Sequence, residues 1–222
     1  MSGKPTAIVY VDGFNLYRRL LANNDSLKWL DLYSLFQSKL PQLEVLRIEY
    51  FTANLKPNTV DDPQSVVRQQ IYLRALKTDS RIRIHLGQFR VDKRFMSTIP
   101  PTIHPVSGKA VLVPVRKIEE KGSDVNLATR MVADALTNKC DVVVLVTNDS
   151  DHAGQARMLI EEFSKRVGLI TPVQESKRSS KQLKQLRLEF HKELTVSELQ
   201  DSQLPEILSD SIGRFRRPKK WA

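Results

Sequence analysis

The chain of 222 residues contains a single cysteine, Cys140, which excludes an intrachain disulfide and a cysteine-rich zinc site. Cys140 lies between an expected helix and an expected strand, so we interpret it as a packed or half-buried thiol. Long apolar runs are also missing, because none approaches the roughly 20 residues that a membrane-spanning helix needs. The N-terminal residues show no signal-peptide pattern. We therefore expect a cytoplasmic protein that has no membrane partner.

The motifs of several common enzyme classes are missing as well. The sequence has no GxSxG nucleophile elbow, no HExxH zinc motif and no GxxxxGK[ST] phosphate loop. Three histidines, His85, His104 and His191, are scattered along the chain and indicate no metal cluster. Chemistry based on serine, zinc or a phosphate-binding loop therefore has no support in the sequence.

Basic residues outnumber acidic ones, with 35 Lys and Arg against 25 Asp and Glu and a formal net charge of +10. The pI of about 9.8 passes the rough threshold for a nucleic-acid-binding domain. Charge runs are often solvated faces, so contact with nucleic acid and simple solvation are equally supported. The first set of candidates for backbone contact is Arg81, Arg83, Arg90, Lys93, Arg94 and Lys121. The second set lies at the end of the chain and comprises Arg214, Arg216, Arg217, Lys219 and Lys220.

The order of strands and helices predicts an α/β fold. A fully apolar run at 7–11 is typical of a strand buried on both faces of a parallel sheet, and the segment 141–147 is the strongest strand pattern in the chain. Further strands are expected at 45–51, 82–86 and 167–170, and helices at 14–22, 30–40, 63–77, 124–136 and 153–163. Such β-α alternation predicts a mostly parallel sheet with helices on both of its faces.

Two regions have weaker patterns. Residues 111–115 contain Pro114, which predicts an edge strand or one arm of a hairpin. For the C-terminal part, we predict a basic helix at 176–190 followed by an extended, polar tail from about 196. We therefore divide the chain into a domain at 1–175 and a tail at 176–222 that packs on the domain or extends from it.

Aspartates stand where the buried strands end. Asp12 follows the first strand, Asp149 and Asp151 follow the strand at 141–147, and Asp124 opens the helix before that strand. Each of them alone has a local interpretation as a turn residue or a helix cap. Right-handed β-α-β connections, however, bring such loops to the same edge of the sheet, where like charges repel unless a cation compensates them. We therefore predict a metal-binding cluster.

The ligand type limits the choice of metal. Oxygen ligands suit Mg²⁺ or Mn²⁺ better than zinc. A metal at this edge can lower the pKa of a bound water and orient it for attack on a phosphate.

Three motifs together resemble the NYN domain family of PIN-like nucleases: VYVDGFNL at 9–16, EKGSDVNL at 120–127 and VLVTNDSD at 144–151. They occur in the family's order and span about residues 6–171. The resemblance implies a PIN-like three-layer α/β/α fold and Mg²⁺- or Mn²⁺-dependent hydrolysis of RNA. It also implies that Asp12, Asp124 and Asp149 are metal ligands, that Asp151 is the second acid of the strand-end motif, and that Asn15 orients a ligand or a phosphate.

The sequence departs from the family pattern at two positions. Asn148 replaces the usual glycine, and His152 replaces an aromatic residue. We expect His152 to face solvent in the first turn of a helix, although contact with a phosphate or a role in proton transfer is an alternative. Glu120 is expected to support the site without binding the metal.

The leading hypothesis is a metal-dependent ribonuclease that acts as an endonuclease on single-stranded or loop RNA. A second hypothesis is an RNA-binding protein with a weak or vestigial nuclease site, because Asn148 and His152 change the site. A third is a metal-dependent phosphatase or Toprim-like enzyme, because Asp149 and Asp151 form a DxD at a strand end. RNA is the expected partner in the first two cases, and a homo-oligomer is left open.

Overall fold

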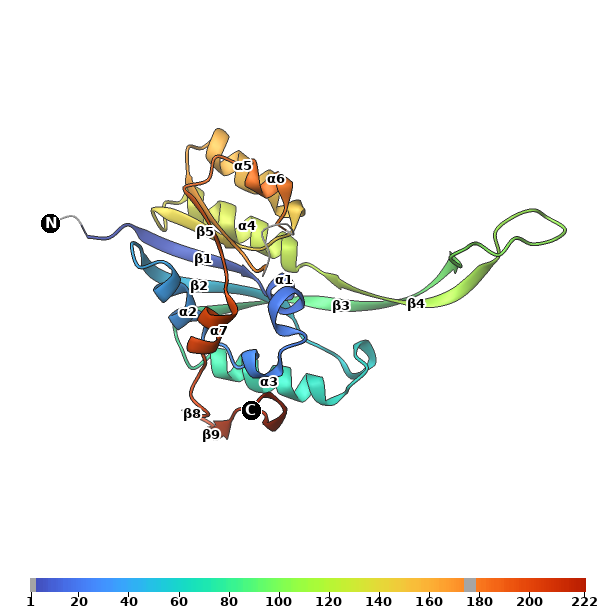
Figure 1. Ribbon diagram of the computed structural model, residues 1–222, viewed down its shortest axis with the longest axis horizontal. Helices are drawn as coiled ribbons and strands as arrows, with labels where there is room; N and C mark the ends of the chain where they lie inside the picture. Colours follow the sequence, from blue (N-terminus) through green and yellow to red (C-terminus); the bar gives the residue numbers. More distant parts are fainter. Residues whose placement is uncertain (1–2, 174–178) are drawn as a thin grey trace.

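The computed structural model describes residues 3–173 and 179–222, and its centre is a seven-stranded sheet in the order β4-β3-β2-β1-β5-β6-β7 (Figure 1). Neighbouring strands are parallel except β3 and β4, which are antiparallel. The prediction of a mostly parallel sheet is therefore confirmed. The strands are β1 (Thr6–Asp12), β2 (Glu44–Ala53), β3 (Ile82–Ser97), β4 (Leu112–Lys121), β5 (Val142–Val146), β6 (Arg166–Thr171) and β7 (Phe190–Glu193).

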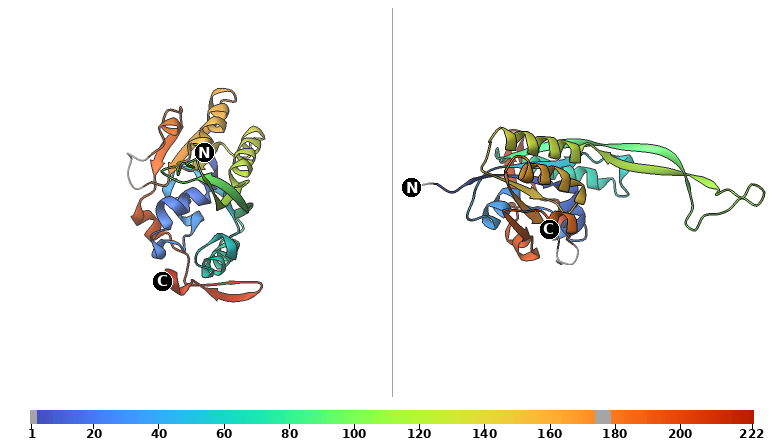
Figure 2. Two further views of the ribbon diagram at one scale, coloured as in Figure 1. Left: turned by 90° about the vertical axis from the view of Figure 1, so that its right-hand side faces the viewer. Right: turned by 90° about the horizontal axis from the view of Figure 1, so that it is seen from above.

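Helices cover both faces of this sheet, as the views in Figure 2 show. One layer contains α4 (Ser123–Leu136), α5 (Ala153–Glu161) and α6 (Lys181–Lys184). The other contains α1 (Gly13–Leu16), η1 (Tyr17–Leu21), α2 (Leu32–Lys39), α3 (Gln64–Leu76) and α7 (Val196–Asp201). Short turns η2 (Asp25–Leu27), η3 (Pro57–Thr59) and η4 (Ser150–His152) lie between these elements. The arrangement is the predicted three-layer α/β/α fold.

The central strands are apolar throughout because both of their faces are buried. On β1, Ala7, Val9 and Val11 belong to the core under α2 and α3, whereas Ile8 and Tyr10 belong to the core under α4 and α5. The same alternation holds along β5. Burial on both sides removes the polar face that a surface strand would show, which explains the unbroken apolar runs in the sequence.

Strands β3 and β4 continue beyond the body as a two-stranded arm, residues 88–121 (Figure 1). Strand β3 pairs with β2 only as far as Gly87, and its partner from Gln88 to Ser97 is β4. The prediction of a hairpin arm around Pro114 is confirmed, but β3 is much longer than the expected strand at 82–86. Residues of the arm contact no core, so their sequence carries no burial pattern that would have predicted the extension.

The C-terminal residues pack against the body. Strand β7 forms the edge of the central sheet, and the chain then forms the hairpin β8 (Ile207–Asp210) and β9 (Gly213–Arg216) and the turn η6 (Lys219–Trp221). The Trp221 ring lies 6.4 Å from the Trp29 ring and 6.2 Å from the Tyr72 ring. Of the helix expected at 176–190, residues 176–178 lie outside the described part, and only α6 is helical in the remainder. None of the helices in the described ranges has the length and apolar character that crossing a membrane requires.

Candidate metal centre

The candidate centre lies at the carboxyl ends of two adjacent strands. Strands β1 and β5 are parallel neighbours, so the residues that follow them meet at the same edge of the sheet. Asp12 ends β1, while Thr147 and η4 directly follow β5. Asp124 reaches this edge from the first turn of α4.

Asp12 is held in place by two hydrogen bonds and is 6% exposed. Its Oδ1 accepts a hydrogen bond from the backbone N–H of Asn15 at 2.9 Å, which caps α1, and its Oδ2 accepts one from Thr147 Oγ1 at 2.9 Å. Thr147 Oγ1 in turn accepts a hydrogen bond from the backbone N–H of Asp149 at 3.0 Å. The local capping role of Asp12 and its place in the centre are therefore compatible.

His152 points its Nε2 atom at two carboxylates. This atom lies 3.9 Å from Asp12 Oδ2 and 3.8 Å from Asp124 Oδ1, and it has no hydrogen-bond partner among residues 3–173 and 179–222. The residue is 1% exposed, so the prediction of a solvent-facing His152 is wrong. The reason is the tight 3₁₀ turn η4, which Asp149 caps by accepting a hydrogen bond from the backbone N–H of Asp151. This turn brings residue 152 back over the strand ends instead of outward.

Among the residues that the structure describes, no Lys or Arg pairs with these two carboxylates, and the electrostatic effect of His152 lowers the pKa of each by less than burial raises it. Burial is the largest cause that raises the pKa of Asp12, although hydrogen bonds from Asn15 and Thr147 act in the opposite direction. Burial also raises the pKa of Asp124, and the negative charge of Asp12 raises it further. Both shifts indicate that the charged forms are disfavoured in the protein as it stands.

These three side chains fit a divalent metal ion. One ligand atom from each of Asp12, Asp124 and His152 can be chosen so that all three lie within 4.8 Å of one another. The set comprises two carboxylate oxygens and one imidazole nitrogen, a mixture that transition metals accept more readily than Mg²⁺ does. The buried, unpartnered Nε2 atom is the strongest sign, because a buried polar atom without a partner is costly unless something binds it.

Gln155 holds the other ring nitrogen of His152, with 2.6 Å between Gln155 Nε2 and His152 Nδ1. The amide oxygen and nitrogen of a glutamine exchange places in a half-turn flip of the amide group. With the oxygen facing Nδ1, the ring would donate from Nδ1 and leave the lone pair of Nε2 directed at the two carboxylates. Such a partner on the second nitrogen is usual for histidines that bind metals.

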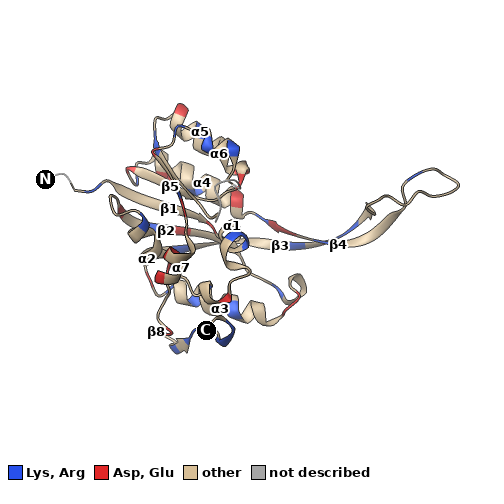
Figure 3. Cartoon of the chain, in the orientation of Figure 1, with Lys and Arg blue, Asp and Glu red and all other residues tan. Residues whose placement is uncertain are grey.

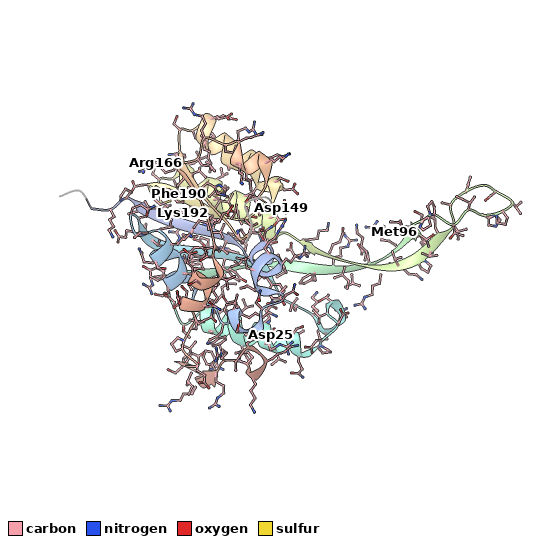
Figure 4. The ribbon with its side chains drawn as sticks, in the orientation of Figure 1. Asp25, Met96, Asp149, Arg166, Phe190 and Lys192 are labelled. Atoms are coloured by element: carbon pink, nitrogen blue, oxygen red, sulfur yellow. The ribbon has the colours of Figure 1, made fainter. Side chains whose placement is uncertain are left out.

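The expected site residues Asn15, Asp149 and Asp151 surround this cluster. Asn15 Oδ1 accepts a hydrogen bond from the backbone N–H of Asn148 at 3.0 Å and so joins the loops that follow β1 and β5. Asp149 is half-buried and Asp151 exposed, and both negative charges raise the pKa of Asp124. Figure 4 labels Asp149 at the side of the body from which the arm leaves. Direct binding of a metal by Asp149 stays a prediction.

The candidate basic residues lie in two separate places. Arg81 directly precedes β3, at the opposite edge of the sheet from the centre, where it forms an ion pair with Asp79 and covers the ring of Tyr33. Arg83 is the second residue of the same strand, and its Nη1 atom lies 3.8 Å from Glu49 Oε1.

The other basic candidates lie on the arm, beyond the edge that carries the centre (Figure 3). They are Arg90, Lys93, Arg94 and Lys121. Lys121 is three residues before Asp124, so the base of the arm adjoins the centre. The structure therefore places four of the six residues on the arm, and Lys121 is the one at its base. The C-terminal basic cluster lies beside η2, since η6 contacts that turn.

The comparisons with known proteins agree with this architecture. The NYN domain profile matches residues 6–194, which is most of the chain. The chain belongs to the NYN domain family. The predicted membership in the PIN-like ribonuclease superfamily is therefore confirmed, and so is the PIN-like fold class.

Two individual proteins are similar to this NYN domain protein. It is 30% identical to 6-hydroxy-3-succinoylpyridine 3-monooxygenase HspA of Pseudomonas putida (strain DSM 28022 / S16), over 96% of this chain and 74% of that protein. The fold is similar to the crystal structure of a protein of unknown function, VPA0982 of Vibrio parahaemolyticus RIMD 2210633, with a TM-score of 0.55. That pair is 19% identical, and the likeness covers 92% of this chain and all of the other.

Sequence reasoning missed one supporting residue of the NYN centre, Thr147, and named another, Glu120. Thr147 links Asp12 to the backbone of Asp149, and its place directly after β5 was the available signal. Glu120 was expected to support the site, and it does contact Ser123, the residue before Asp124. Its carboxylate accepts hydrogen bonds from the Ser123 backbone N–H at 3.0 Å and from Ser123 Oγ at 2.6 Å, which fixes the start of α4.

Proposed function

We propose that this NYN domain protein is a metal-dependent ribonuclease that hydrolyses RNA phosphodiester bonds, acting as an endonuclease. The observation that carries the proposal is the buried, unpartnered Nε2 atom of His152, which faces two carboxylates of raised pKa. Family membership supplies the reaction type, because it points to nuclease-type hydrolysis. The absence of other nucleophile motifs from the sequence agrees with hydrolysis by water.

Each residue has a proposed role. Asp12, Asp124 and His152 would hold the ion, which when bound would supply a Lewis acid for the phosphate and lower the pKa of a water. Thr147 keeps Asp12 oriented through its hydroxyl group, and Asn15 keeps the loops after β1 and β5 together. Asp149 uses Oδ1 to cap η4, so Oδ2 is the proposed acceptor for the proton of the attacking water. Asp151 is proposed to support Asp149 at the exposed mouth.

The donor set favours Mn²⁺ over Mg²⁺. An imidazole nitrogen suits Mn²⁺ better than Mg²⁺, which prefers oxygen ligands and keeps several of its waters. We therefore propose RNA cleavage in which both ions support activity and Mn²⁺ acts at the lower concentration.

The test is cleavage of end-labelled single-stranded RNA with Mn²⁺, with Mg²⁺ and with EDTA. The variants are Asp12→Asn, Asp124→Asn and Asp149→Asn, and Asp61→Asn is the matched control because it changes an exposed aspartate outside the centre. We expect metal-dependent cleavage by the wild type and the control, and a loss of at least two orders of magnitude in each variant. RNA binding without cleavage would favour the RNA-binding hypothesis. Hydrolysis of an aryl phosphate without cleavage of RNA would favour the phosphatase hypothesis.

A second candidate is an oxygenase reaction, because the relative HspA is named a monooxygenase. The specific observation that favours it is the mixed donor set of Asp12, Asp124 and His152, since non-heme iron oxygenases also combine imidazole and carboxylate ligands. The relevant assay is oxygen consumption by the protein with Fe²⁺, an electron donor and 6-hydroxy-3-succinoylpyridine. Oxygen uptake that depends on this substrate, in a preparation that does not cleave RNA, would replace the ribonuclease proposal.

A further inference from the structure

The arm carries an excess of positive charge in an exposed position. Seven of its residues are Lys or Arg and three are Asp or Glu. Its two strands pair over ten residues each, from Gln88 opposite Lys121 to Ser97 opposite Leu112. Figure 4 labels Met96 far from the body, and Figure 1 shows the whole arm extending away from the sheet. A two-stranded ribbon of this kind is marginally stable alone, which favours a binding partner.

The two faces of the arm differ in how their charges are compensated. On one face, Asp92 pairs with Arg90 at 2.9 Å and with Arg94 at 3.4 Å. On the same face, Glu119 pairs with Lys117 at 2.6 Å and with Lys121 at 3.4 Å. This face is called the paired face below.

The opposite face contains two cations that have no acidic partner within the described ranges. Lys93 lies directly opposite Arg116 in the register of the two strands. Like charges in directly opposed positions destabilise a pair of strands. The opposed positions of Lys93 and Arg116 therefore destabilise the free arm, but they become favourable when an anion lies between the two cations. We call this surface the cation face and define it by Lys93, Phe95, Pro114 and Arg116.

Apolar groups on the cation face surround the two cations. Phe95 and Pro114 are the next opposed pair, and the Phe95 ring is 62% exposed, with Lys93 Nζ 5.9 Å from its centre. An open depression of about 450 Å³ lies beside the two cations, and it is lined by Val91, Asp92, Lys93, Pro114, Val115 and Arg116. A cation pair beside an exposed aromatic ring combines the two features that bind single-stranded nucleic acid, a charged track for the backbone and a surface for base stacking.

The cation face is connected to the candidate centre. Arg116 is five residues before Lys121, which corresponds to about 17 Å along a strand. A second open depression, of about 480 Å³, lies at the base of the arm and is lined by residues of both strands and by Asn126 of α4. Asn126 is two residues after Asp124, so this depression lies within one helical turn of that aspartate along α4. A nucleic-acid strand on the arm would therefore reach the carboxylates without crossing the body.

We propose that the cation face binds the backbone of single-stranded RNA and directs the strand along the base of the arm to the candidate centre. This inference rests on the proposed function for its substrate class. Single-stranded RNA is the ligand because the exposed Phe95 ring can stack on an unpaired base, whereas paired bases are already stacked on each other. The arm would thus act on long RNA and leave the shortest substrates unaffected.

The experiment measures binding of a fluorescent, unstructured RNA of about 16 nucleotides to the Asp124→Asn protein in EDTA, by anisotropy at several salt concentrations. The test variant adds Lys93→Ala and Arg116→Ala. The matched control adds Arg94→Ala and Lys117→Ala, which also removes two charges from the arm but from the paired face. We expect roughly tenfold weaker binding and a salt slope smaller by about 1.4 in the test variant, because each phosphate contact to a single strand contributes about 0.7. The control is expected to change binding less than threefold.

Cleavage by proteins that keep Asp124 separates this proposal from the proposed function. The Lys93→Ala/Arg116→Ala change should slow cleavage of the long RNA and leave cleavage of a dinucleotide unchanged. If Lys93→Ala/Arg116→Ala weakens RNA binding but the wild type cleaves no RNA, the arm binds RNA as proposed and the ribonuclease proposal is wrong. Equal effects of the two double variants, or no effect of either, would overturn the arm proposal. Arm-dependent dimerisation in sedimentation experiments, with unchanged RNA binding, would also overturn it.

Discussion

Two groups of wholly or partly buried acids lie within the same domain, and they differ in whether a Lys or Arg of the described residues compensates them. The first group is Glu49 and Asp134. Glu49 is 0% exposed, and its carboxylate contacts Arg47 Nε at 2.5 Å and His85 Nε2 at 2.6 Å. Asp134 contacts Arg47 Nη2 at 2.7 Å and accepts a hydrogen bond from Tyr10 at 3.0 Å. The second group is Asp12 and Asp124, which have only the unpartnered nitrogen of His152 between them.

The pKa shifts of the two groups have opposite signs. Burial tends to raise the pKa of Glu49, but hydrogen bonds from His85 and Arg47 outweigh it, and the pKa is lowered. Burial raises the pKa of Asp12, and its own hydrogen bonds do not reverse the shift. Since burial acts in the same direction on both, the difference lies in the partners. The contacts of the compensated group are those of a structural ion-pair network, whereas the uncompensated group is the proposed position of a ligand cation.

The largest effect is expected from removing the cation of the compensated group. Arg47→Met leaves Glu49 and Asp134 buried with less compensation, so the free energy of unfolding should fall by about 3–5 kcal/mol. Urea denaturation measures this change. Arg68→Met is the matched control, because Arg68 pairs with the exposed Asp62 and should cost much less. Equal losses in the two variants would contradict the comparison.

Supplying a cation to the uncompensated group should stabilise the protein. Mn²⁺ at a hundred times its Kd should add about 2.7 kcal/mol to the free energy of unfolding, and EDTA should remove this gain. The measurement is thermal unfolding with and without the metal. The gain should be absent from Asp124→Asn, and an equal gain in that variant would place the ion elsewhere.

The pH dependence of the compensated group follows from the lowered pKa of Glu49. Because the pKa of Glu49 is lower in the folded protein than in the unfolded chain, its carboxylate stabilises the fold at pH values above the unfolded pKa of 4.5. This stabilisation is lost as the pH falls through the pKa of the folded protein. Glu49→Gln should therefore be less stable than the wild type at pH 7 by about 1.5–3 kcal/mol, the range for hydrogen bonds to charged groups. The difference should narrow below pH 4.5. A difference that stays constant over this range would show that packing, rather than charge, is responsible.

The smallest expected change in the free energy of unfolding is an increase, and it comes from a substitution in the uncompensated group. The pKa of Asp124 is higher in the folded protein than in the unfolded chain. Its contribution to the stability of the fold is therefore fully present below the unfolded pKa of 3.8 and is lost as the pH rises through the pKa of the folded protein. In EDTA at pH 7, Asp124→Asn should therefore stabilise the protein, by no more than about 1 kcal/mol because this side chain is half exposed. The gain should disappear in acid below pH 3.8. Destabilisation at pH 7 would contradict the account.

The sequence was enough to predict the layers of the fold and that two acids of the candidate centre lie close together. Apolar runs on β1 and β5, together with the rule that strand ends share an edge, predicted that Asp12 and Asp124 would meet. The sequence did not predict the inward position of His152, because that position depends on the turn η4 and on contacts with Thr147, Asp149 and Gln155. A motif shows the order of residues but not the direction of a side chain in a tight turn.

Two further features depend on contacts that are distant in the sequence. The strand expected at 45–51 did not reveal that α4 covers Arg47 and Glu49, since Asp134 is 87 residues from Arg47. The length of the arm was also missed, because residues 88–97 pair with β4 and contact no core. In both cases the missing information is a contact between residues distant in the sequence, which hydrophobic periodicity does not predict.

The most direct test of the metal centre is the electron paramagnetic resonance spectrum of bound Mn²⁺. The experiment compares the wild type, the His152→Gln variant and the Asp61→Asn control, each labelled with ¹⁵N-histidine. The account predicts a magnetic coupling between Mn²⁺ and one histidine nitrogen in the wild type and the control, and its loss in His152→Gln together with weaker Mn²⁺ binding. A coupling that persists in His152→Gln, or Mn²⁺ that binds equally well without any coupling to nitrogen, would contradict a centre formed by Asp12, Asp124 and His152.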